Sequence, residues 1–320
     1  MQRRQMLSLA LGSLAVPAWA QGKWPSKPIT IVAPYAPGGG PDILARMLAE
    51  EFGKTLGATI VENKPGMSGS TGAGYVAKAP PDGYTLLLTT TATQSINPAL
   101  YADVPYDAGK DFTAIARVAT TATVLVVAND VPAKSVQELV EYARRNPGKL
   151  SYASAGPGTM QHITAELMRA KAGVDLLHVP YKGTSQIVPD LLSGRVSMMF
   201  NSPAAVMQFV DQGKLRALAV TSAERLPKRP NLPTMAESGM PGFEATAWYG
   251  LFGPANMPRD VVQKLSAEVD RILKMPAVLA RLDSLGLEPA PGGPDVMAKA
   301  AHDDLQKWSA LIKARKISAQ

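Results

Sequence analysis

Two glycine-rich loops are the segments of this chain best suited to binding a small molecule. One is Ala36-Pro-Gly-Gly-Gly-Pro-Asp42, after an apolar strand predicted at 29–35, and the other is Ala155-Gly-Pro-Gly-Thr159, after a strand predicted at 150–154. Each loop precedes an amphipathic helix, whose first N–H groups lack intrahelical acceptors and lie at the positive end of the helix dipole. The sequence therefore predicts unpaired N–H groups that can bind an anion at each loop. Two such loops on separate lobes would hold a small carboxylate between them.

Neither loop contains lysine or arginine, so backbone N–H groups would have to hold the anion. A hydrogen bond to a charged group contributes roughly 1.5–3 kcal/mol, and a helix N-terminus adds about 0.3–2 kcal/mol. About four such bonds and two helix ends give a gross ~7–16 kcal/mol before ordering and desolvation costs. A micromolar complex requires only about 8 kcal/mol. A salt bridge is not needed.

The first loop contains residues with both ligand-binding and structural interpretations. Gly38, Gly39 and Gly40 permit close approach of the backbone to a ligand, although such a run is often only a turn. Their place between a strand and a helix favours binding. Asp42 would compete with an anionic ligand for the same helix end, so a role in accepting hydrogen bonds from loop amides is favoured over direct contact.

Polar side chains at the strand ends are further candidates. Ser154 and Thr159 have hydroxyls that can donate to a ligand or cap the following helix. Tyr35 and Tyr181 each end a predicted strand, and we expect both to lie at the ligand site rather than in a core.

Other chemistries have weaker support. A secreted serine hydrolase would use a serine such as Ser154 with His162, but the chain has no G-x-S-x-G motif. His162, His178 and His302 lie far apart without metal-ligand spacing, and no cysteine is present. The glycines at 69–74 lack the order of a dinucleotide-binding loop. We expect no enzyme activity, no catalytic residues, no bound metal and no cofactor.

Strand and helix signals alternate along the chain, which predicts an α/β fold. Ser135-Val-Gln-Glu138 is a capping box that predicts a helix to Arg145. Pro258 opens another helix, and the last thirty residues predict a third with Trp308 and Leu311 on its apolar side. Strands are predicted at 29–35, 58–63, 85–90, 113–118, 124–129, 150–154, 175–181, 196–201, 215–221 and 249–253.

The length suits two domains better than one core. Thr120-Thr-Ala-Thr123 interrupts two strand-like runs, so the chain is expected to cross there between lobes and to return near 243–249. The predicted lobes are 21–121 plus 250–320, which is discontinuous, and 122–249. Two crossings form a two-strand hinge that allows the lobes to close on a ligand.

The first twenty residues have the layout of a secretory signal peptide. Arg3-Arg4 precede an apolar run from Leu7 to Val16, and Ala18-Trp-Ala20 is a cleavage site before Gln21. Export would use the Sec or the twin-arginine route, and the mature protein would be periplasmic. The net charge of +7 comes from dispersed basic residues, which favours a solvated surface over a nucleic-acid interface.

A series of motifs along the mature chain resembles the Bug (TctC-type) extracytoplasmic solute-binding receptors of tripartite tricarboxylate transporters. The resemblance implies a type II periplasmic-binding-protein fold, with two α/β lobes around a ligand cleft. The motifs include Trp24-Pro-Ser-Lys-Pro-Ile29, Pro34-Tyr-Ala-Pro-Gly-Gly-Gly-Pro-Asp42, Val61-Glu-Asn-Lys-Pro-Gly66, Pro81-Asp-Gly-Tyr84, His178-Val-Pro-Tyr-Lys-Gly183 and Trp248-Tyr-Gly250.

The resemblance also implies binding segments. The loop from Tyr35 to Asp42 matches the segment that binds one ligand carboxylate, residues 89–92 match a second wall, and residues 154–159 match the loop for the other carboxylate. Asn201 stands where many relatives carry aspartate or glycine. The predicted ligand-binding residues are Tyr35, Pro37, Gly38, Gly39, Gly40, Asp42, Thr89, Thr91, Ser154, Gly156, Gly158, Thr159, Tyr181 and Asn201.

The resemblance implies a periplasmic receptor that delivers a small carboxylate to membrane transporter subunits, although an orphan receptor would have none. Tricarboxylates, dicarboxylates, acidic amino acids and aromatic acids are the ligand classes it implies. A ligand sensor for a membrane kinase uses the same site and stays open as an alternative, with the hydrolase behind it. We expect a monomer that binds no nucleic acid.

Overall fold

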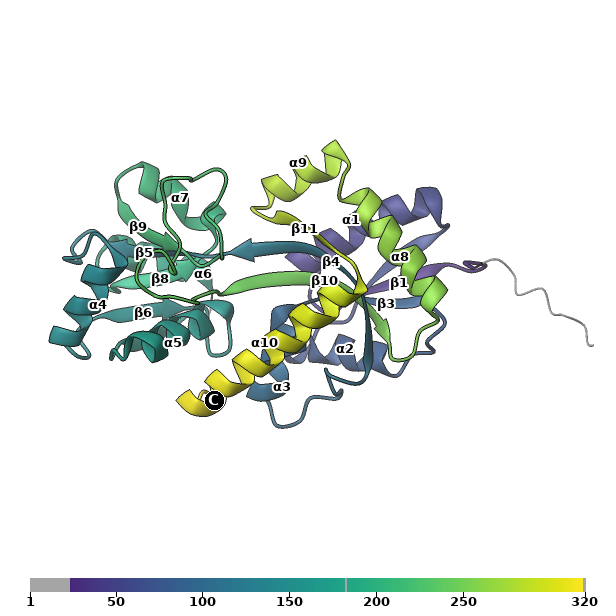
Figure 1. Ribbon diagram of the computed structural model, residues 1–320, viewed down its shortest axis with the longest axis horizontal. Helices are drawn as coiled ribbons and strands as arrows, with labels where there is room; N and C mark the ends of the chain where they lie inside the picture. Colours follow the sequence, from purple (N-terminus) through teal and green to yellow (C-terminus); the bar gives the residue numbers. More distant parts are fainter. Residues whose placement is uncertain (1–23, 182, 319–320) are drawn as a thin grey trace, which may run out of the picture.

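A computed structural model describes residues 24–181 and 183–318, so the predicted signal peptide lies outside the described residues. Figure 1 shows two α/β lobes side by side, each built on one sheet, which confirms the predicted fold class. Within the described residues, no helix is long and apolar enough to cross a bilayer.

The first sheet has the strand order β11-β4-β10-β3-β1-β2. Its strands are β1 (Ile29–Ala33), β2 (Thr59–Asn63), β3 (Thr85–Thr90), β4 (Phe112–Ala122), β10 (Thr246–Pro254) and β11 (Glu288–Gly292). Its helices are α1 (Gly40–Thr55), α2 (Ser70–Ala77), α3 (Asn97–Leu100), α8 (Arg259–Ile272), α9 (Pro276–Ser284) and α10 (Pro294–Arg315), with the short turns η1 (Met67–Gly69) and η2 (Ala92–Ile96).

The second sheet has the order β7-β6-β8-β5-β9. Its strands are β5 (Val124–Ala128), β6 (Ser151–Ser154), β7 (Leu177–Pro180), β8 (Met198–Asn201) and β9 (Leu215–Val220). Its helices are α4 (Val136–Arg145), α5 (Met160–Ala172), α6 (Thr184–Leu192) and α7 (Pro203–Asp211).

The chain passes between the two sheets at two neighbouring places. It leaves the first sheet at the end of β4, and β5 begins after Thr123; it returns from Ala245 into β10. The threonine-rich segment is strand as far as Ala122, where we had expected a break, because β-branched residues suit the pleated surface that β10 covers. Only Thr123 separates the two strands.

A single hydroxyl joins the two crossing segments. Thr221 is fully buried, its Oγ1 accepts from the Thr123 backbone N–H at 2.9 Å, and it donates to the Ala245 carbonyl at 2.8 Å. The Ala245 N–H in turn donates to the Thr221 carbonyl. The end of β9 therefore fixes both crossings with respect to each other.

The strand registers place both glycine-rich loops at the edges where the sheets meet. In the first sheet, Thr90 pairs with Tyr249 near the start of β10, and β1 runs parallel to β3, so both β1 and β3 end at the crossing. In the second sheet, the first residue of β5, Val124, pairs with Asn201 at the end of β8, and β6 runs parallel to β8. The loops that follow β1 and β6 thus leave facing edges.

Several elements were not predicted from the sequence, among them β11 and η2. β11 has the sequence Glu-Pro-Ala-Pro-Gly, whose prolines argue against a strand, but it is an edge strand that pairs only with β4, where proline is tolerated. η2 is a π-helical turn, a rare form that often occurs at functional sites.

The predicted helix signals are confirmed. Ser135 Oγ accepts from the Glu138 N–H at 3.1 Å, and the Glu138 carboxylate accepts from Lys134 N–H rather than from the cap residue itself.

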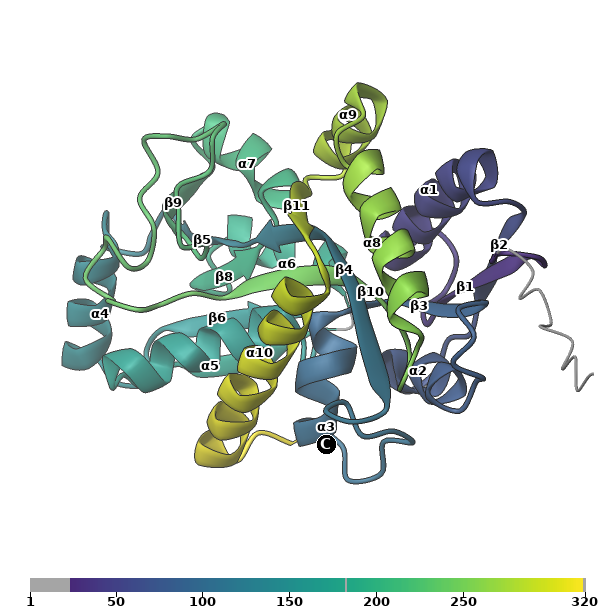
Figure 2. The ribbon, with the colours of Figure 1, turned by 45° about the vertical axis from the view of Figure 1, so that its right-hand side comes forward.

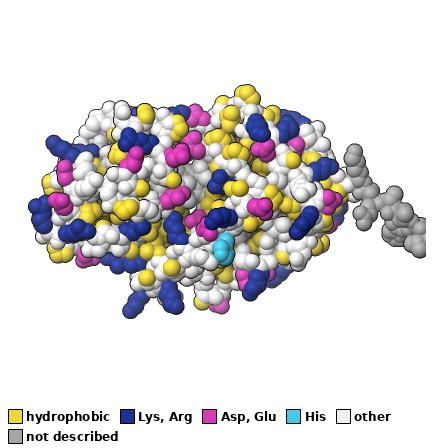
Figure 3. Space-filling view, in the orientation of Figure 1, with side chains coloured by type: hydrophobic (Ala, Val, Ile, Leu, Met, Phe, Trp, Pro, Cys, Tyr) yellow, Lys and Arg dark blue, Asp and Glu magenta, His cyan; other side chains and the backbone are white. Residues whose placement is uncertain are grey.

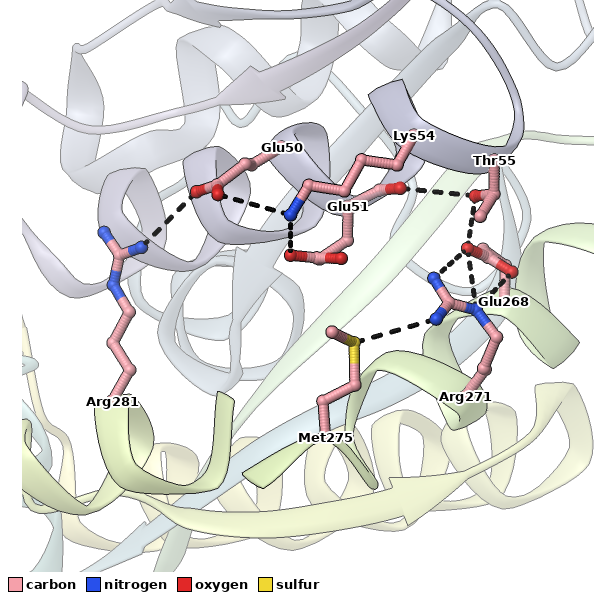
Figure 4. A network of polar contacts seen from close by, with 8 residues as sticks. All are labelled: Glu50, Glu51, Lys54, Thr55, Glu268, Arg271, Met275 and Arg281. Atoms are coloured by element: carbon pink, nitrogen blue, oxygen red, sulfur yellow. Dashed lines mark hydrogen bonds and ion pairs between the residues drawn. The ribbon is translucent and has the colours of Figure 1, made fainter. Parts of the chain in front are cut away.

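In the first lobe, polar contacts join α1 to α8 and α9, including Thr55 with Glu268 and Arg281 with Glu50 (Figure 4). The ion pair between Arg281 and Glu50 is exposed and adds little stability.

The last helix, α10, spans both lobes (Figure 2). Met297, near its start, packs with Trp248 and Phe252 of the first lobe, whereas Trp308 and Leu311 belong to the core of the second. Its C-terminal end adds an ion pair, Arg315 Nε to Glu166 Oε2 at 3.0 Å. The helix therefore ties the lobes together beside the hinge.

Replacing Trp308 tests this tie. Trp308 is 0% exposed, and its Nε1 has no hydrogen-bond partner among the described residues. Trp308→Ala should lower the free energy of unfolding by about 3–5 kcal/mol in urea denaturation. Trp308→Phe keeps an aromatic ring and loses no hydrogen bond, so its loss should be clearly smaller. Equal stability of the alanine variant and the wild type would contradict this packing.

Candidate functional site

The first glycine-rich loop leaves the N-terminus of α1 without a side-chain cap. Pro37 and Gly38 are exposed, Gly39 is the N-cap of α1, and no side chain caps this helix. Gly38 has φ +85°, which favours glycine. Because Pro41 has no N–H, the donors of this helix end come from the glycines and from Asp42. This loop matches the predicted open N-terminus.

Asp42 is buried and surrounded by donors of its own lobe. Its carboxylate accepts from Gly38 N–H at 2.9 Å, from Asn63 Nδ2 at 2.9 Å and from Arg46. Burial would raise the pKa of Asp42, but the hydrogen bonds from Arg46, Gly38 and Asn63 outweigh burial and lower that pKa. The carboxylate therefore shapes the loop, as the favoured interpretation expected.

Two tyrosines lie beside this loop. The Tyr35 hydroxyl contacts Thr90 Oγ1 at 3.1 Å and Thr93 Oγ1 at 2.6 Å, and burial raises its pKa. A Cβ on Gly40 would lie 2.9 Å from the hydroxyl of Tyr249, which comes from β10 at the hinge. Gly40 is thus needed for the close approach of α1 to Tyr249.

The second wall predicted on this lobe is buried. Thr91 Oγ1 accepts from the Trp248 N–H at 2.9 Å and so fixes the end of β3 to β10. Thr89 is fully buried, and its Oγ1 has no hydrogen-bond partner among the residues that the structure covers.

The second loop has more of its N–H groups occupied by its own side chains than the first, in which the Gly38 N–H donates to Asp42. Ala155 N–H donates to Gln161 Oε1 at 2.7 Å, Gly156 N–H to Ser154 Oγ at 3.1 Å, and Gly158 N–H to His162 Nδ1 at 3.1 Å. The prediction of unpaired N–H groups is therefore wrong for this part of the loop. Acceptors on β6 and on the first turn of α5 reach back to it, a contact that loop composition does not reveal.

Thr159 is the N-cap of α5. Its Oγ1 accepts from the His162 N–H at 3.4 Å and donates to the Gly156 carbonyl at 2.7 Å. Together with the His162–Gly158 bond, this forms a reciprocal cap that fixes the loop to the helix. The capping role is present, and a role toward a ligand stays a prediction.

A stack of three aromatic rings lies beside the second loop, and its two histidines bond to residues of that loop. His162 and His178 stack with ring centroids 4.2 Å apart, and Tyr152 stacks on His178 at 4.8 Å. Burial, and then the neighbouring His178, lower the pKa of His162 to about 4, and burial also lowers the pKa of His178. Both imidazoles are therefore neutral at pH 7 and act as hydrogen-bonding groups.

The hydrolase hypothesis paired Ser154 with His162, but Ser154 contacts His178 instead. Ser154 Oγ lies 2.7 Å from His178 Nε2, because β6 and β7 are neighbouring parallel strands. Ser154 is 0% exposed.

The last two predicted residues lie at the same end of the second sheet. The Tyr181 hydroxyl donates to Asp190 at 2.8 Å, and burial raises its pKa. Asn201 is buried at the end of β8, and its Oδ1 accepts from Gln161 Nε2 at 3.2 Å.

The lobes touch at the second loop. A Cβ on Gly158 would clash with Leu100 of α3 in the other lobe, and Gly158 has φ +76°. On the opposite side, Lys228 forms an ion pair with Asp283, and Gly286 lies against Ala204. The structure thus has the two lobes in contact on both sides of the hinge.

Sequence reasoning missed four residues that the fold adds to these loops: Gln161, His178, Thr93 and Tyr249. His178 and Tyr249 stand in motifs that had been noted, but no spacing linked them to the loops. Among the described residues, no group of three or more His, Cys, Asp or Glu could hold a metal ion. Lys and Arg are spread over the face in Figure 3, with Asp and Glu between them.

Comparison with known proteins identifies the family. The model of the tripartite tricarboxylate transporter family receptor, TctC, matches residues 44–317. Protein BugT of Bordetella pertussis is 31% identical over 95% of this chain and 94% of its own length. The chain therefore belongs to this family of receptors, which is not a class of enzymes, and the resemblance is confirmed.

Two solved structures agree in fold with this chain. A protein from R. palustris, solved with adipate, has a TM-score of 0.75 and 34% identity, covering 92% of this chain and 99% of its own. MatC from Rhodopseudomonas palustris with bound malate has a TM-score of 0.71 and 33% identity, covering 90% and 99%. These similarities confirm the two-lobed fold of periplasmic solute-binding proteins.

The neutral imidazole of His162 predicts a loss of stability in mild acid. Because the pKa falls from 6.5 to about 4 on folding, the unfolded chain binds a proton in this range that the folded chain does not. The free energy of unfolding should therefore fall between pH 7 and pH 5, by about 1–2 kcal/mol. Urea denaturation at both pH values measures this.

Matched asparagine variants show which histidine is responsible. His162→Asn retains an acceptor near Gly158 but does not titrate, so its stability should vary less with pH. His302 is exposed and bonds only to Gln306 among the contacts described, and His302→Asn should keep the wild-type dependence. Identical pH profiles for all three proteins would refute the assignment.

Proposed function

We propose that this protein is a periplasmic receptor that captures a small carboxylate between its lobes and delivers it to membrane subunits of a tripartite tricarboxylate-type transporter. The proposed lobes are residues 21–121 plus 250–320 and residues 122–249, and the return to the first sheet begins slightly earlier, with β10 at Thr246. The observation that carries this proposal is that two glycine-rich loops, each at a helix N-terminus, lie at facing sheet edges beside the hinge. The bound adipate and malate of two related structures support the ligand class.

The two loops would contribute differently to anion binding. The uncapped end of α1 offers N–H groups directly, together with the positive end of a helix of 16 residues. The loop before the N-terminus of α5 is already ordered by Thr159, Gln161 and His162. Little conformational entropy of this loop would therefore be lost when an anion binds. Because the imidazoles of His162 and His178 are neutral, they would give the anion no opposite charge, and the backbone N–H groups and helix dipoles would hold it.

The site supports binding without a chemical step. The contact between Ser154 and His178 pairs a hydroxyl with an imidazole, but Ser154 is fully buried. Residues 1–20 would direct export, with cleavage after Ala20.

A thermal-shift assay with adipate, malate and the neutral diamide of adipate tests the proposed function. At least one dianion at millimolar concentration should raise the unfolding midpoint by several degrees, because a ligand that binds only the folded state stabilises it. The diamide has the same length without charge and should have no effect. Recovery of the ligand unchanged after incubation separates a receptor from a hydrolase; a cleaved or modified ligand, or no response to any carboxylate, would refute the proposal.

Gly158→Val tests whether the second loop forms part of the site. Its side chain would meet Leu100, so it should prevent the lobes from approaching and lower the affinity for the carboxylate more than tenfold in calorimetry. The double variant Gly158→Val/Leu100→Ala removes the obstructing side chain and should recover part of that loss. Unaltered affinity in folded Gly158→Val would remove this loop from the site.

A further inference from the structure

The side-chain amide of Asn201 has a fixed orientation. Its Oδ1 accepts from the Ser202 backbone N–H at 2.8 Å and from Gln161 Nε2 at 3.2 Å. A backbone N–H can only donate, so the oxygen of the amide must occupy this position. The NH₂ group is thereby directed away from Ser202 N–H and Gln161 Nε2.

That NH₂ group is buried and has no hydrogen-bond partner among the described residues. Asn201 is only 6% exposed, so bulk water does not satisfy it either. Most buried donors in folded proteins are paired, and an unpaired one costs as much as the hydrogen bond it fails to form. An apolar residue would avoid this cost. Six other buried side-chain atoms of the described residues are also unpartnered, so the open donor of Asn201 points to a ligand only in combination with its position in the fold.

The position of Asn201 connects it to the proposed ligand site. It is the last residue of β8, paired with Val124 at the hinge edge of the second sheet. Gln161 links it directly to the second loop, because Gln161 Oε1 accepts from the Ala155 N–H at 2.7 Å while its Nε2 donates to Asn201. Asn201 is therefore linked to the loop that is proposed to bind a carboxylate through one side chain, Gln161, on the Oδ1 side of its amide, and its Nδ2 is the free end of this link among the described residues.

We propose that Asn201 is a specificity-determining residue whose Nδ2 donates to an oxygen of the ligand other than its carboxylates, so that the receptor prefers hydroxy and oxo acids. This inference rests on the proposed function. A hydroxyl or carbonyl oxygen accepts a hydrogen bond from Nδ2, whereas a methylene leaves the donor unpaired and an ammonium group can only donate. Plain dicarboxylates should therefore bind more weakly than their hydroxy or oxo derivatives, and acidic amino acids more weakly still.

Calorimetry with ligands of equal length measures this preference. The four-carbon series is succinate, malate and aspartate, and the five-carbon series is glutarate, 2-oxoglutarate and glutamate. In the series that binds better, the oxygen-bearing ligand should bind about tenfold more tightly than the plain dicarboxylate, which is the usual size of one hydrogen bond to a buried donor.

Two substitutions at residue 201 separate the donor from its surroundings. Asn201→Leu removes the donor and should reduce the preference for the oxygen-bearing ligand over the plain dicarboxylate to about twofold or less. Asn201→Asp has the same shape but presents an acceptor, so the ratio of amino-acid affinity to plain dicarboxylate affinity should rise about tenfold. Ratios within one variant cancel the general repulsion that the added carboxylate exerts on all dianions.

A matched control lies in the same lobe. Thr164 of α5 is also buried with an unpartnered Oγ1, and Thr164→Val removes that polar atom without changing the side-chain shape. It should leave all the affinity ratios unchanged. Circular dichroism and the unfolding midpoint without ligand establish that each variant folds.

The outcomes distinguish this inference from the proposed function. If no carboxylate binds the wild type, both are overturned. If carboxylates bind but all ratios are the same in wild type, Asn201→Leu and Asn201→Asp, then the assignment of Asn201 alone is overturned. A uniform loss of affinity for every ligand in Asn201→Leu, with the ratios preserved, means that Nδ2 binds a carboxylate, and this result also refutes the preference.

Discussion

The hydrogen bonds of Thr221 to Thr123 and Ala245 hold together the two segments that cross between the sheets. Because both crossings occur at one place, the strands that end beside them present their carboxyl ends to the other lobe. β1 and β3 end at this edge in one sheet, and β6 and β8 end at it in the other. The two glycine-rich loops follow β1 and β6, and Tyr181 follows the neighbouring strand β7. The location of the site is therefore a consequence of strand order and of where the chain crosses, and side chains refine it.

The two glycine-rich loops are chemically unequal although their sequences are alike. α1 begins without a side-chain cap, whereas α5 begins with a threonine cap and with Gln161 and His162 reaching back to the loop amides. The ring stack of His162, His178 and Tyr152 continues to Glu166, which accepts from Tyr152 at 2.6 Å. Burial opposes ionisation of Glu166, but hydrogen bonds from Tyr152, Arg169 and Arg315 lower its pKa. The first loop is thus held by Asp42 but has no side-chain cap on its helix, whereas the second loop is capped and is connected to a larger buried polar network.

This polar network also reaches the helix that spans the lobes. Arg315 near the end of α10 forms an ion pair with Glu166, while Met297 near the start of α10 packs in the first lobe. The lobes are further in contact through Leu100 against Gly158 and through the Lys228–Asp283 ion pair. A change in the angle between the lobes would therefore alter contacts at both ends of α10 and on both sides of the hinge. In a binding protein of this fold, such contacts set the balance between open and closed forms.

Local periodicity, turn residues and the order of motifs were enough to predict the α/β class, most strand positions, the capped helix after Ser135 and the family. The sequence did not reveal β11, whose prolines are tolerated only because it lies at a sheet edge, or the contact of Ser154 with His178, which needs β6 and β7 to be neighbours. It also predicted free N–H groups in a loop that Gln161 and His162 occupy. Which polar groups meet, and which lack a partner as Asn201 Nδ2 does, could be seen only in the folded chain. These contacts depend on residues far apart in the sequence and on burial, and no local pattern predicts either.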